Sequence, residues 1–228
     1  MEYVIVTGAS SGIGKAIAHY YLSKDYTVIG IGRDFKKAKH HENFIPVICD
    51  LTQAKEIQKN IVPLVKKYSI KILVNAAGFG RFEPHEELDS AMIESMTAVN
   101  LTAPMKLSNL FLRSIKEHQG MIINITSIEA TRHAKFSALY SATKAGLRAF
   151  GLSLFEEVRK SGVKVITLNP DMTDTPFFDK LRFQPAKGAA LNPKTIIHTL
   201  DLIMQLPEDT VITELTIRPQ YFKLDKKH

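Results

Sequence analysis

The 228-residue sequence has one cysteine, no tryptophan and no long apolar run. The single cysteine, Cys49, excludes an internal disulfide framework and a cysteine-rich metal site, so we expect a reducing, cytoplasmic compartment. No stretch reaches the roughly 18 to 20 uninterrupted apolar residues of a membrane span, and the chain begins Met-Glu-Tyr-Val-Ile-Val rather than with a basic leader. The eight histidines show no metal-ligand spacing. We therefore expect neither a membrane partner nor a metal.

Positive charge is in excess, but it is not concentrated in one part of the chain. The formal net charge is +7, yet the lysines are spread along the chain rather than gathered in one basic stripe. This distribution favours a solvated basic surface over a nucleic-acid partner, and an anionic nucleotide cofactor would use some of the charge. A hydrophobic content of 45% is that of an ordinary globular protein, so we expect one domain over residues 1–228.

Strand-like apolar runs alternate with helical patterns along the whole chain. The predicted strands span residues 3–7, 27–31, 44–49, 70–75, 121–126, 163–168 and 211–217. The predicted helices span residues 13–23, 54–67, 90–118, 137–160 and 193–205. This alternation predicts an α/β fold, a doubly wound seven-stranded parallel sheet with helices on both faces and ligands at the carboxyl ends of the strands. The irregular stretch 171–192 is a candidate substrate lid.

The first predicted strand runs into a glycine-rich loop, Thr7–Gly14, and then into a helix. Glycines at positions 8, 12 and 14 would permit a tight turn, close approach of the backbone to a pyrophosphate, and packing of the helix against the strand. Three glycines alone could form an ordinary turn. Strand, loop and helix in this order predict a dinucleotide site.

The end of the second predicted strand bears on the choice of cofactor. A site for NAD usually has an acid here against the ribose 2′-hydroxyl, but Gly32 occupies that position and Arg33 follows it. A guanidinium suits a 2′-phosphate, so we predict NADP(H). NAD(H) is the alternative if Arg33 is a surface residue and Asp34 binds the ribose. Asp50, after the third strand, is predicted to bind the adenine amino group, or else to cap the next helix.

Tyr140 and Lys144 lie four residues apart on a predicted helix, which places them on one face. A neighbouring ammonium favours the phenolate and lowers a phenol pKa that starts near ~10, so the pair is a plausible proton donor. Ser127 lies thirteen residues before Tyr140. Such pairs are common on solvated helix surfaces, and the chemical interpretation therefore depends on the glycine loop.

Together these motifs resemble those of the short-chain dehydrogenase/reductase family over nearly the whole chain. The loop Thr7–Gly14 is similar to the family's Thr-Gly-x-x-x-Gly-x-Gly, and Asn75-Ala76-Ala77-Gly78 is similar to its Asn-Asn-Ala-Gly, with Ala in place of the second Asn. Four further residues fall where the family has its catalytic tetrad, namely Asn100, Ser127, Tyr140 and Lys144.

The resemblance implies an oxidoreductase that transfers a hydride between the cofactor and the carbonyl or alcohol carbon of a small or medium-sized substrate. Tyr140 would be the general acid, or the base in the reverse direction, and Lys144 would lower its pKa and bind the nicotinamide ribose. Ser127 would hydrogen-bond the substrate oxygen, and Asn100 would hold a water that connects Lys144 to solvent. The simpler alternatives are a cap for Ser127, a helix kink for Asn100 and a surface position for Lys144.

The segment after the sixth predicted strand departs from the family at one position. Asp171 stands where the family has Gly after Pro170, which is tolerable if Asp adopts a left-handed conformation, and it places a negative charge near the cofactor. Thr173 would offer its backbone to the carboxamide, and Thr175 its hydroxyl to the phosphates. The cofactor-binding residues implied are Gly8, Ser10, Ser11, Gly12, Ile13, Gly14, Arg33, Asp50, Leu51, Asn75, Ala76, Ala77, Gly78, Tyr140, Lys144, Pro170, Asp171, Thr173 and Thr175.

The sequence indicates the substrate less clearly than it indicates the cofactor. The lid contains Met172, Phe177, Phe178, Leu181 and Phe183, which predict an apolar inner surface. Lys180 or Arg182 could bind a carboxylate, as in a hydroxy-acid dehydrogenase, although a solvated lid charge is the simpler interpretation. A catalytically idle NADP(H)-binding regulatory protein is the alternative from another class, and the intact tetrad disfavours it.

Helices 90–118 and 137–160 carry apolar residues on more than one face, which suggests an interface. Related family members pair these helices, so the resemblance implies a homodimer or homotetramer. The residues concerned are Leu107, Leu110, Phe111, Leu147, Phe150, Leu154 and Phe155.

Overall fold

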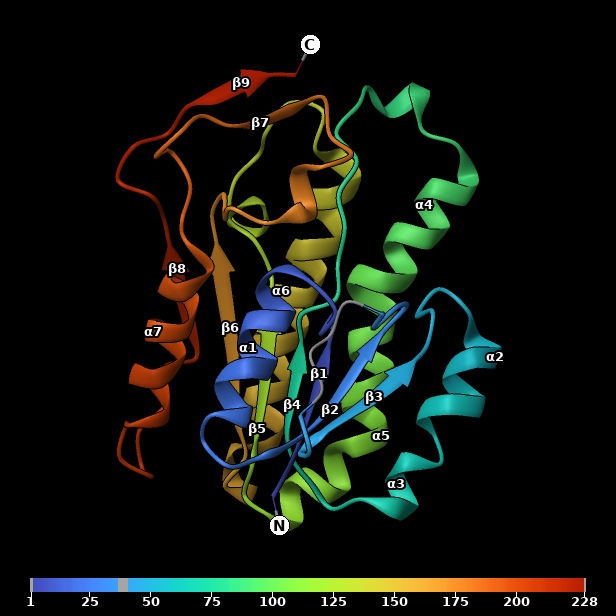
Figure 1. The fold of residues 1–228 in the computed structure, drawn as a ribbon, viewed down its shortest axis with the longest axis vertical. Helices are drawn as coiled ribbons and strands as arrows, with labels where there is room; N and C mark the ends of the chain where they lie inside the picture. The colour runs from blue at the N-terminus through green and yellow to red at the C-terminus, as the bar shows by residue number, and fades with distance from the viewer. Residues whose placement is uncertain (1, 37–40, 228) are drawn as a thin grey trace.

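A computed structural model describes residues 2–36 and 41–227 and contains a seven-stranded, entirely parallel main sheet (Figure 1). The strand order β3-β2-β1-β4-β5-β6-β8 is that of a doubly wound fold, so the predicted fold class is confirmed. The strands are β1 (Tyr3–Thr7), β2 (Thr27–Gly32), β3 (Phe44–Ile48), β4 (Ile70–Asn75), β5 (Met121–Ile125), β6 (Lys164–Pro170) and β8 (Glu214–Ile217). The order reverses between β1 and β4, and a ligand crevice is expected there.

Helices cover both faces of this sheet. The helices α1 (Gly12–Leu22) and α7 (Pro193–Met204) pack on one face, and α5 (Ala103–Glu117) and α6 (Ala138–Val158) pack on the other. Successive residues of a strand point to opposite faces, so Val4 and Val6 pack in the core cluster on the side of α1 and α7, and Ile5 packs in the cluster on the side of α5 and α6. Within the described residues, no helix is long and apolar enough to cross a membrane.

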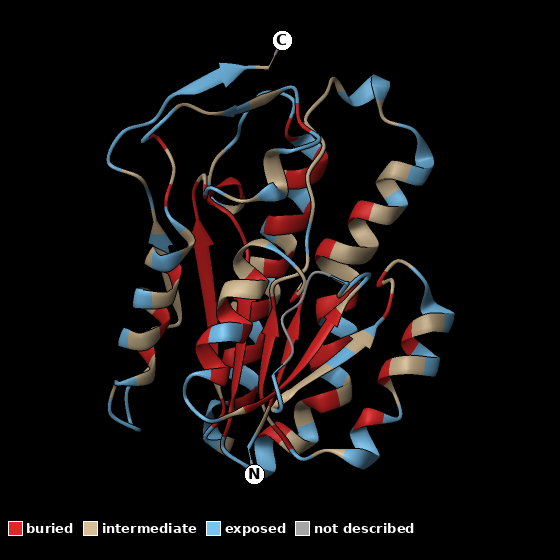
Figure 2. Cartoon of the chain, viewed as in Figure 1, coloured by how far each residue is buried: buried red, intermediate tan, exposed pale blue. Residues whose placement is uncertain are grey.

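Burial explains the sequence character of the strands. Every residue of β5 is buried, and the central strands consist mostly of Val, Ile and Leu because both of their faces are covered (Figure 2). The edge strand β3 is only partly buried and carries Pro46, whose missing N–H is tolerated at a sheet edge.

Two of the predicted helices are interrupted by π-helical turns. The stretch 54–67 divides into α2 (Ala54–Glu56), the turn η1 (Ile57–Ile61) and α3 (Leu64–Lys67). The stretch 90–118 divides into α4 (Ser90–Thr97), the turn η3 (Ala98–Thr102) and α5. Pro63 and Pro104 follow these turns, and a proline has no N–H for the carbonyl four residues earlier. The stretch 90–117 is therefore one continuous helix with a π-helical turn inside it, close to its predicted extent, whereas the predicted helix 54–67 is broken at Val62 and Pro63.

The candidate lid is built from two parts of the chain. Its strand β7 (Phe183–Pro185) pairs antiparallel with the near-terminal strand β9 (Leu224–Lys226), and both lie beyond the carboxyl ends of the main strands (Figure 1). The Lys227 ammonium donates hydrogen bonds to the carbonyls of Phe178 and Asp179. The short 3-10 turns are η2 (His85–Glu87), η4 (Ile128–Ala130), η5 (Arg159–Ser161) and η6 (Pro176–Phe178). The sequence patterns did not predict β9.

The apolar residues that suggested an interface mostly serve the core of their own chain. Five are buried, namely Leu107, Phe111, Leu147, Leu154 and Phe155. Leu110 and Phe150 are partly buried and pack against the same core. These side chains do not form a second exposed apolar face, and the homo-oligomer stays a prediction that rests on the family resemblance.

Candidate active site

The four predicted catalytic side chains come together beyond the carboxyl ends of β4 and β5. Ser127 follows β5, Asn100 lies in η3, and Tyr140 and Lys144 lie on α6. All four are buried, with Asn100 fully enclosed. The long-range contacts described below bring together three segments that are far apart in the sequence.

The Tyr140 phenol is neutral in this environment. Burial raises its pKa well above the ordinary value, the Ser127 hydroxyl opposes the rise by hydrogen bonding, and the negative charge of Glu129 adds to it. The Lys144 ammonium lies 5.9 Å from the centroid of the Tyr140 ring. The expected lowering of the phenol pKa by Lys144 is therefore not found, because burial is the larger effect. A protonated phenol is the form that donates a proton.

Lys144 is a buried cation with one short backbone contact. Its ammonium donates to the Ile125 carbonyl at 3.0 Å, and burial lowers its pKa from 10.5 to about 8. A β-carbon at Gly78 would lie 3.1 Å from the Lys144 nitrogen and 3.2 Å from Asn100 Oδ1. The turn after β4 thus passes directly against both side chains, and only a glycine fits there without displacing them.

Asn100 links the loop after β4 to α6. Its Oδ1 accepts from the Phe79 N–H at 3.1 Å, and its Nδ2 donates to the Phe79 carbonyl at 2.9 Å and to Thr143 Oγ1 at 3.2 Å. The side chain therefore bonds two segments other than its own helix. The sequence analysis did not identify Phe79 and Thr143 as partners of Asn100.

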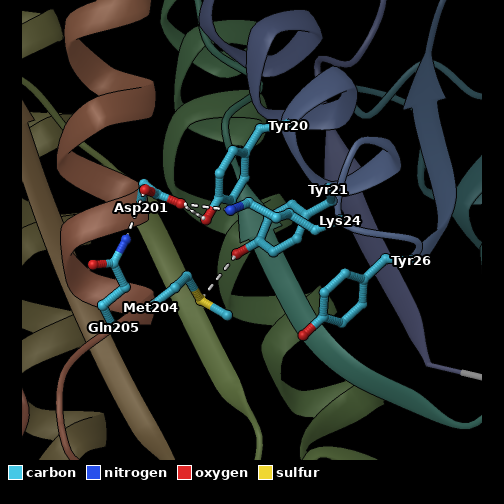
Figure 3. Close-up of a pocket in the computed structure, with 7 residues that line it drawn as sticks. All are labelled: Tyr20, Tyr21, Lys24, Tyr26, Asp201, Met204 and Gln205. Carbon is cyan, nitrogen blue, oxygen red and sulfur yellow. Dashed lines mark hydrogen bonds and ion pairs between the residues drawn. The ribbon is translucent and has the colours of Figure 1, made fainter.

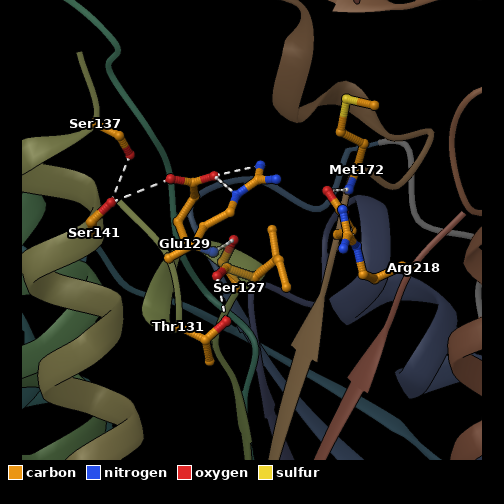
Figure 4. Close-up of polar contacts among 10 residues, drawn as sticks. Ser127, Glu129, Thr131, Ser137, Ser141, Met172 and Arg218 are labelled. Atoms are coloured by element: carbon orange, nitrogen blue, oxygen red, sulfur yellow. Dashed lines mark hydrogen bonds and ion pairs between the residues drawn. The ribbon is translucent and has the colours of Figure 1, made fainter. Parts of the chain in front are cut away.

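Ser127 has the capping arrangement that the sequence offered as one of its two alternatives. Its Oγ accepts from the Glu129 N–H at 3.2 Å and caps η4. A hydroxyl that accepts in this way still has its O–H to donate. The buried Glu129 carboxylate binds Arg132 at 2.6 Å and lies 3.4 Å from the Ser141 hydroxyl of α6 (Figure 4).

The glycine loop has the geometry of a phosphate cradle. Gly8 and Gly12 have φ values of +67° and +54°, which disfavour any other residue. A β-carbon at Gly14 would come 2.4 Å from the Gly8 carbonyl oxygen, so the packing of α1 against the loop requires glycine. Ser11 precedes α1 without a side-chain cap. The N–H groups of the first turn suit an anion, and these residues fit the diphosphate of a dinucleotide.

Thr7 joins the glycine loop to the turn after β4. Its buried hydroxyl oxygen accepts from the N–H groups of Ala76 and Ala77 at 2.9 and 3.0 Å, and it donates to the Val74 carbonyl at 3.3 Å. The sequence identified Thr7 only as part of a motif. Its role as the link between the two loops required the structure.

The end of β2 lies next to the glycine loop. A β-carbon at Gly32 would be 3.2 Å from Ser10 Oγ, so this position faces the loop. Arg33 is exposed, and the Asp34 carboxylate accepts from the Lys36 N–H at 2.7 Å. An exposed arginine thus follows the residue that faces the loop, while Asp34 is already engaged in a turn.

Asp50 closes a turn before α2. Its Oδ1 accepts from both the N–H and the hydroxyl of Thr52, each at 2.9 Å, which corresponds to the capping alternative. Leu51 is buried in the core cluster that includes α5 and α6. Both residues follow the carboxyl end of β3, just as the glycine loop follows the carboxyl end of β1.

Asp171 does not adopt the left-handed conformation proposed to accommodate it. Its N–H donates to the Ile217 carbonyl at 2.8 Å, which continues the pairing of β6 with β8 in a conformation open to any residue. The carboxylate accepts from Met172 N–H at 2.8 Å and from Arg218 Nε at 3.0 Å (Figure 4). The negative charge that the sequence placed here is therefore compensated by Arg218.

The segment after Pro170 crosses the start of α1. A β-carbon at Gly12 would lie 3.4 Å from the Thr175 β-carbon. The Thr175 hydroxyl donates to the Thr173 carbonyl at 3.2 Å, and buried Thr173 bonds to the Asp171 carbonyl at 3.0 Å. Thr175 thus stands beside the glycine loop, where the resemblance placed it.

Aromatic rings enclose the Tyr140 ring. Phe82 and Phe177 have their ring centroids 5.2 and 5.9 Å from that of Tyr140, and Phe183 lies 5.4 Å from Phe82. The apolar inner surface predicted for the lid is therefore present. Phe82, which the sequence analysis did not single out, is its centre.

A separate cavity of about 210 Å³ lies between α1 and α7 (Figure 3). Asp201 there binds Lys24 at 3.0 Å and accepts from the Tyr20 hydroxyl at 2.9 Å. None of the predicted catalytic or cofactor-binding residues lines it. Its lining residues are Tyr20, Tyr21, Lys24, Tyr26, Asp201, Met204 and Gln205.

Comparison with known proteins finds relatives that match nearly the whole chain. The family described as short chain dehydrogenase matches residues 2–186. An uncharacterized oxidoreductase of Staphylococcus saprophyticus is 33% identical over 96% of this chain and 97% of its own length. The alcohol dehydrogenase of the archaeon Thermococcus sibiricus, solved with 5-hydroxy-NADP, is 26% identical, with a TM-score of 0.87 and 98% of each chain covered. A 4-hydroxyisoleucine dehydrogenase solved with NADH shares the fold, with 23% identity, a TM-score of 0.85, and 96% of this chain and 98% of that chain covered.

Proposed function

The chain belongs to the short-chain dehydrogenase family, and on that premise we propose that it is an NADP(H)-dependent carbonyl reductase, or the corresponding alcohol dehydrogenase, acting on small or medium-sized substrates. The observation that carries this proposal is the buried cluster of Tyr140, Lys144, Ser127 and Asn100 next to a glycine loop of phosphate-binding geometry. A protein that only bound a nucleotide would have no use for the four polar side chains.

Each side chain of the cluster has a distinct task in this proposal. The bound cofactor supplies a hydride to the carbonyl carbon or accepts one from the alcohol carbon. Tyr140, protonated because it is buried, donates its proton to the carbonyl oxygen, and it takes a proton up in the reverse direction. Ser127 donates its hydroxyl to the same oxygen and stabilises the developing negative charge. Lys144 contributes positive charge and a hydrogen bond to the ribose. Asn100 holds the loop after β4 in place through its hydrogen bonds to the Phe79 backbone.

Different residues bind different parts of the cofactor in this proposal. The glycine loop and Thr175 hold the diphosphate, and the turn Asn75–Gly78 with Lys144 holds the nicotinamide side. Asp50 and Leu51 contact the adenine. Residues 171–192 close over the substrate as a lid within a single domain.

Arg33 carries the preference for NADP(H). Gly32, which faces Ser10 of the loop, presents no carboxylate to a 2′-phosphate, and the next residue is the exposed Arg33. We expect Arg33→Ala to raise the KM for NADPH about tenfold or more and to leave the KM for NADH nearly unchanged, since a charge-assisted hydrogen bond contributes about 1.5–3 kcal/mol. A clear preference of the unmodified protein for NADH would overturn this assignment in favour of Asp34.

The test of the enzyme itself is NADPH consumption over a panel of aldehydes, diketones and keto acids. Tyr140→Phe keeps the ring and removes the acid, so turnover should fall by a factor of about 10² to 10⁴. Tyr221→Phe, at a side chain that is 75% exposed, is the matched control and should behave as the unmodified protein. Tight NADPH binding without turnover on any substrate would favour the regulatory alternative.

We also propose that the protein is a homodimer or homotetramer of the cytoplasm. Cys49 is buried and burial raises the pKa of its thiol to about 11, so it stays an unreactive thiol, as a reducing compartment permits. Light scattering on the purified protein measures the mass directly. A monomer at micromolar concentration would contradict the first part of this proposal.

A further inference from the structure

We propose that Glu83 directs this site toward uncharged carbonyl substrates that carry a flat apolar group, because its carboxylate occupies the two guanidinium groups that would otherwise bind a substrate carboxylate. This inference rests on the proposed function and decides between a carbonyl reductase and a hydroxy-acid dehydrogenase. Two observations carry it, the aromatic surface beside Tyr140 and the pairing of the nearby arginines.

The surface next to the proposed proton donor is aromatic. Phe82 and Phe177 lie 6.4 Å apart, and each has its ring tilted against that of Tyr140, at 5.2 and 5.9 Å. Leu88, Met92 and Ile93 pack against the same cluster. Rings at these separations offer edge and face contacts to another flat group. An alkyl or aryl substituent on the carbonyl is therefore the favourable neighbour for this surface.

Glu83 joins the two loops that carry these rings. It follows Phe82, and its carboxylate is 2.7 Å from Arg81 and 3.7 Å from Arg182, which precedes the lid residue Phe183. The Glu83 side chain is only 10% exposed, whereas those of Arg81 and Arg182 are 41% and 83% exposed. One largely buried carboxylate thus engages two more exposed cations, and one of them is the lid arginine considered above as a carboxylate ligand.

The other arginines around the site follow the same pattern. Arg132 is 2.6 Å from Glu129, and Arg218 is 3.0 Å from Asp171. The side chains of the two acids are 8% and 1% exposed. Arg81, Arg132, Arg182 and Arg218 thus each have a protein carboxylate as their partner.

A substrate carboxylate would have to compete with these acids. Binding to Arg81 or Arg182 would bring a second negative charge against Glu83, and displacing Glu83 would leave a largely buried carboxylate without its partners. Both outcomes are costly. The ion pairs thus act against anionic substrates while the rings act in favour of apolar ones, and specificity arises from both.

A matched pair of substrates isolates the charge. Methyl phenylglyoxylate and phenylglyoxylate share the phenyl group and the reacting ketone, but only the second is an anion. We expect the unmodified protein to show the higher kcat/KM with the ester. In Glu83→Gln, kcat/KM for the acid should rise about tenfold and that for the ester should stay within about twofold, since freed guanidiniums can form charge-assisted hydrogen bonds.

Two further variants control this experiment. Glu87→Gln makes the same chemical change at an exposed residue of the same loop, and it should leave both substrates unaffected. Adding Arg182→Ala to Glu83→Gln should remove a large part of the gain on the acid. An unmodified protein that prefers the acid, or a Glu83→Gln variant that matches Glu87→Gln, would overturn the inference.

A binding measurement separates this inference from the proposed function. Calorimetry with phenylacetate and phenylacetamide in the presence of NADP⁺ requires no turnover. Glu83→Gln should raise the affinity for phenylacetate about tenfold and leave that for phenylacetamide unchanged. Absence of turnover with this shift present would contradict the proposed function alone, whereas turnover without this shift would contradict the role of Glu83 alone.

Discussion

Replacing Lys144 by Met should make the protein more stable at neutral pH, although it removes a residue proposed for catalysis. Burial lowers the pKa of this lysine from 10.5 to about 8, so below pH 8 the folded protein holds a proton that the unfolded chain binds more tightly. The gap corresponds to about 3 kcal/mol at about 1.4 kcal/mol per pKa unit. Met removes this cost, but it also removes the hydrogen bond to the Ile125 carbonyl, which costs about 1–2 kcal/mol. The net gain expected near pH 7 is about 1–2 kcal/mol.

The pH dependence gives the sharper test. In the unfolded chain this lysine stays protonated up to about pH 10.5, whereas in the folded protein it loses its proton above about pH 8. The stability of the protein with Lys144 should therefore rise with pH between about 8 and 10.5, because its folded state no longer carries the buried charge. Relative to the Met variant, the free energy of unfolding of the protein with Lys144 should increase by about 2–3 kcal/mol between pH 7 and 10. The free-energy difference between the two should therefore change sign within this range.

Urea denaturation at pH 7, 8, 9 and 10 measures this difference. Both proteins should carry Tyr140→Phe, so that titration of the neighbouring phenol makes no contribution. Lys160→Met, at an exposed lysine after α6, is the matched control and should follow its parent at every pH. Parallel stability curves for the lysine and methionine proteins would refute the assignment of a buried, desolvated charge to Lys144.

Three further predictions concern residues that support the site, and a fourth substitution, at Gly188, is the control for the first of them. Gly14→Ala forces a β-carbon to 2.4 Å from a backbone oxygen, and it should cost about 1–3 kcal/mol in thermal unfolding and weaken NADPH binding in a fluorescence titration. Gly188→Ala, at a positive φ with open space around it, should cost about 1 kcal/mol and leave NADPH binding unchanged. Arg218→Ala removes the ion-pair partner of buried Asp171, and it should lower the free energy of unfolding by only about 1–2 kcal/mol because Arg218 is itself half exposed. Adding Asp171→Gly should recover much of this stability, as measured by urea denaturation. Asn100→Ala removes the three hydrogen bonds of a fully buried side chain, so it should lower kcat at least about tenfold and stability by about 2–3 kcal/mol. A variant with normal kcat would contradict its role.

The main sheet was predictable because each of its strands is a short apolar run bounded by turns. Every strand of the sheet lies within a few residues of its predicted range, since burial on both faces leaves a continuous apolar pattern. The short strand β9 gave no such pattern. All three of its residues are exposed, and its pairing with β7 depends on a segment about forty positions away. Propensity within a short window carries no information about such a partner.

The site was predictable at the level of which residues meet. The environment of those residues was not. Spacing along α6 placed Tyr140 and Lys144 on one helix, but the pKa of each is governed by burial, which spacing does not report. Asp171 and Arg218 are 47 positions apart, and only the pairing of β6 with β8 brings them together. The apolar pattern of the predicted helix 90–118 did not indicate the π-helical turn that holds Asn100 and that Pro104 follows.

The two-part lid has a practical consequence for anyone who purifies this protein. The strand β9 pairs with β7 and Lys227 is bonded to the lid, whereas β1 begins at the opposite end of the molecule (Figure 1). An affinity tag fused after Lys227 would therefore emerge beside the candidate lid. A tag placed before Tyr3 would emerge at the amino edge of the sheet, far from the site. Kinetic constants from the two kinds of fusion should not be pooled, and the amino-terminal fusion is the appropriate one for measuring specificity.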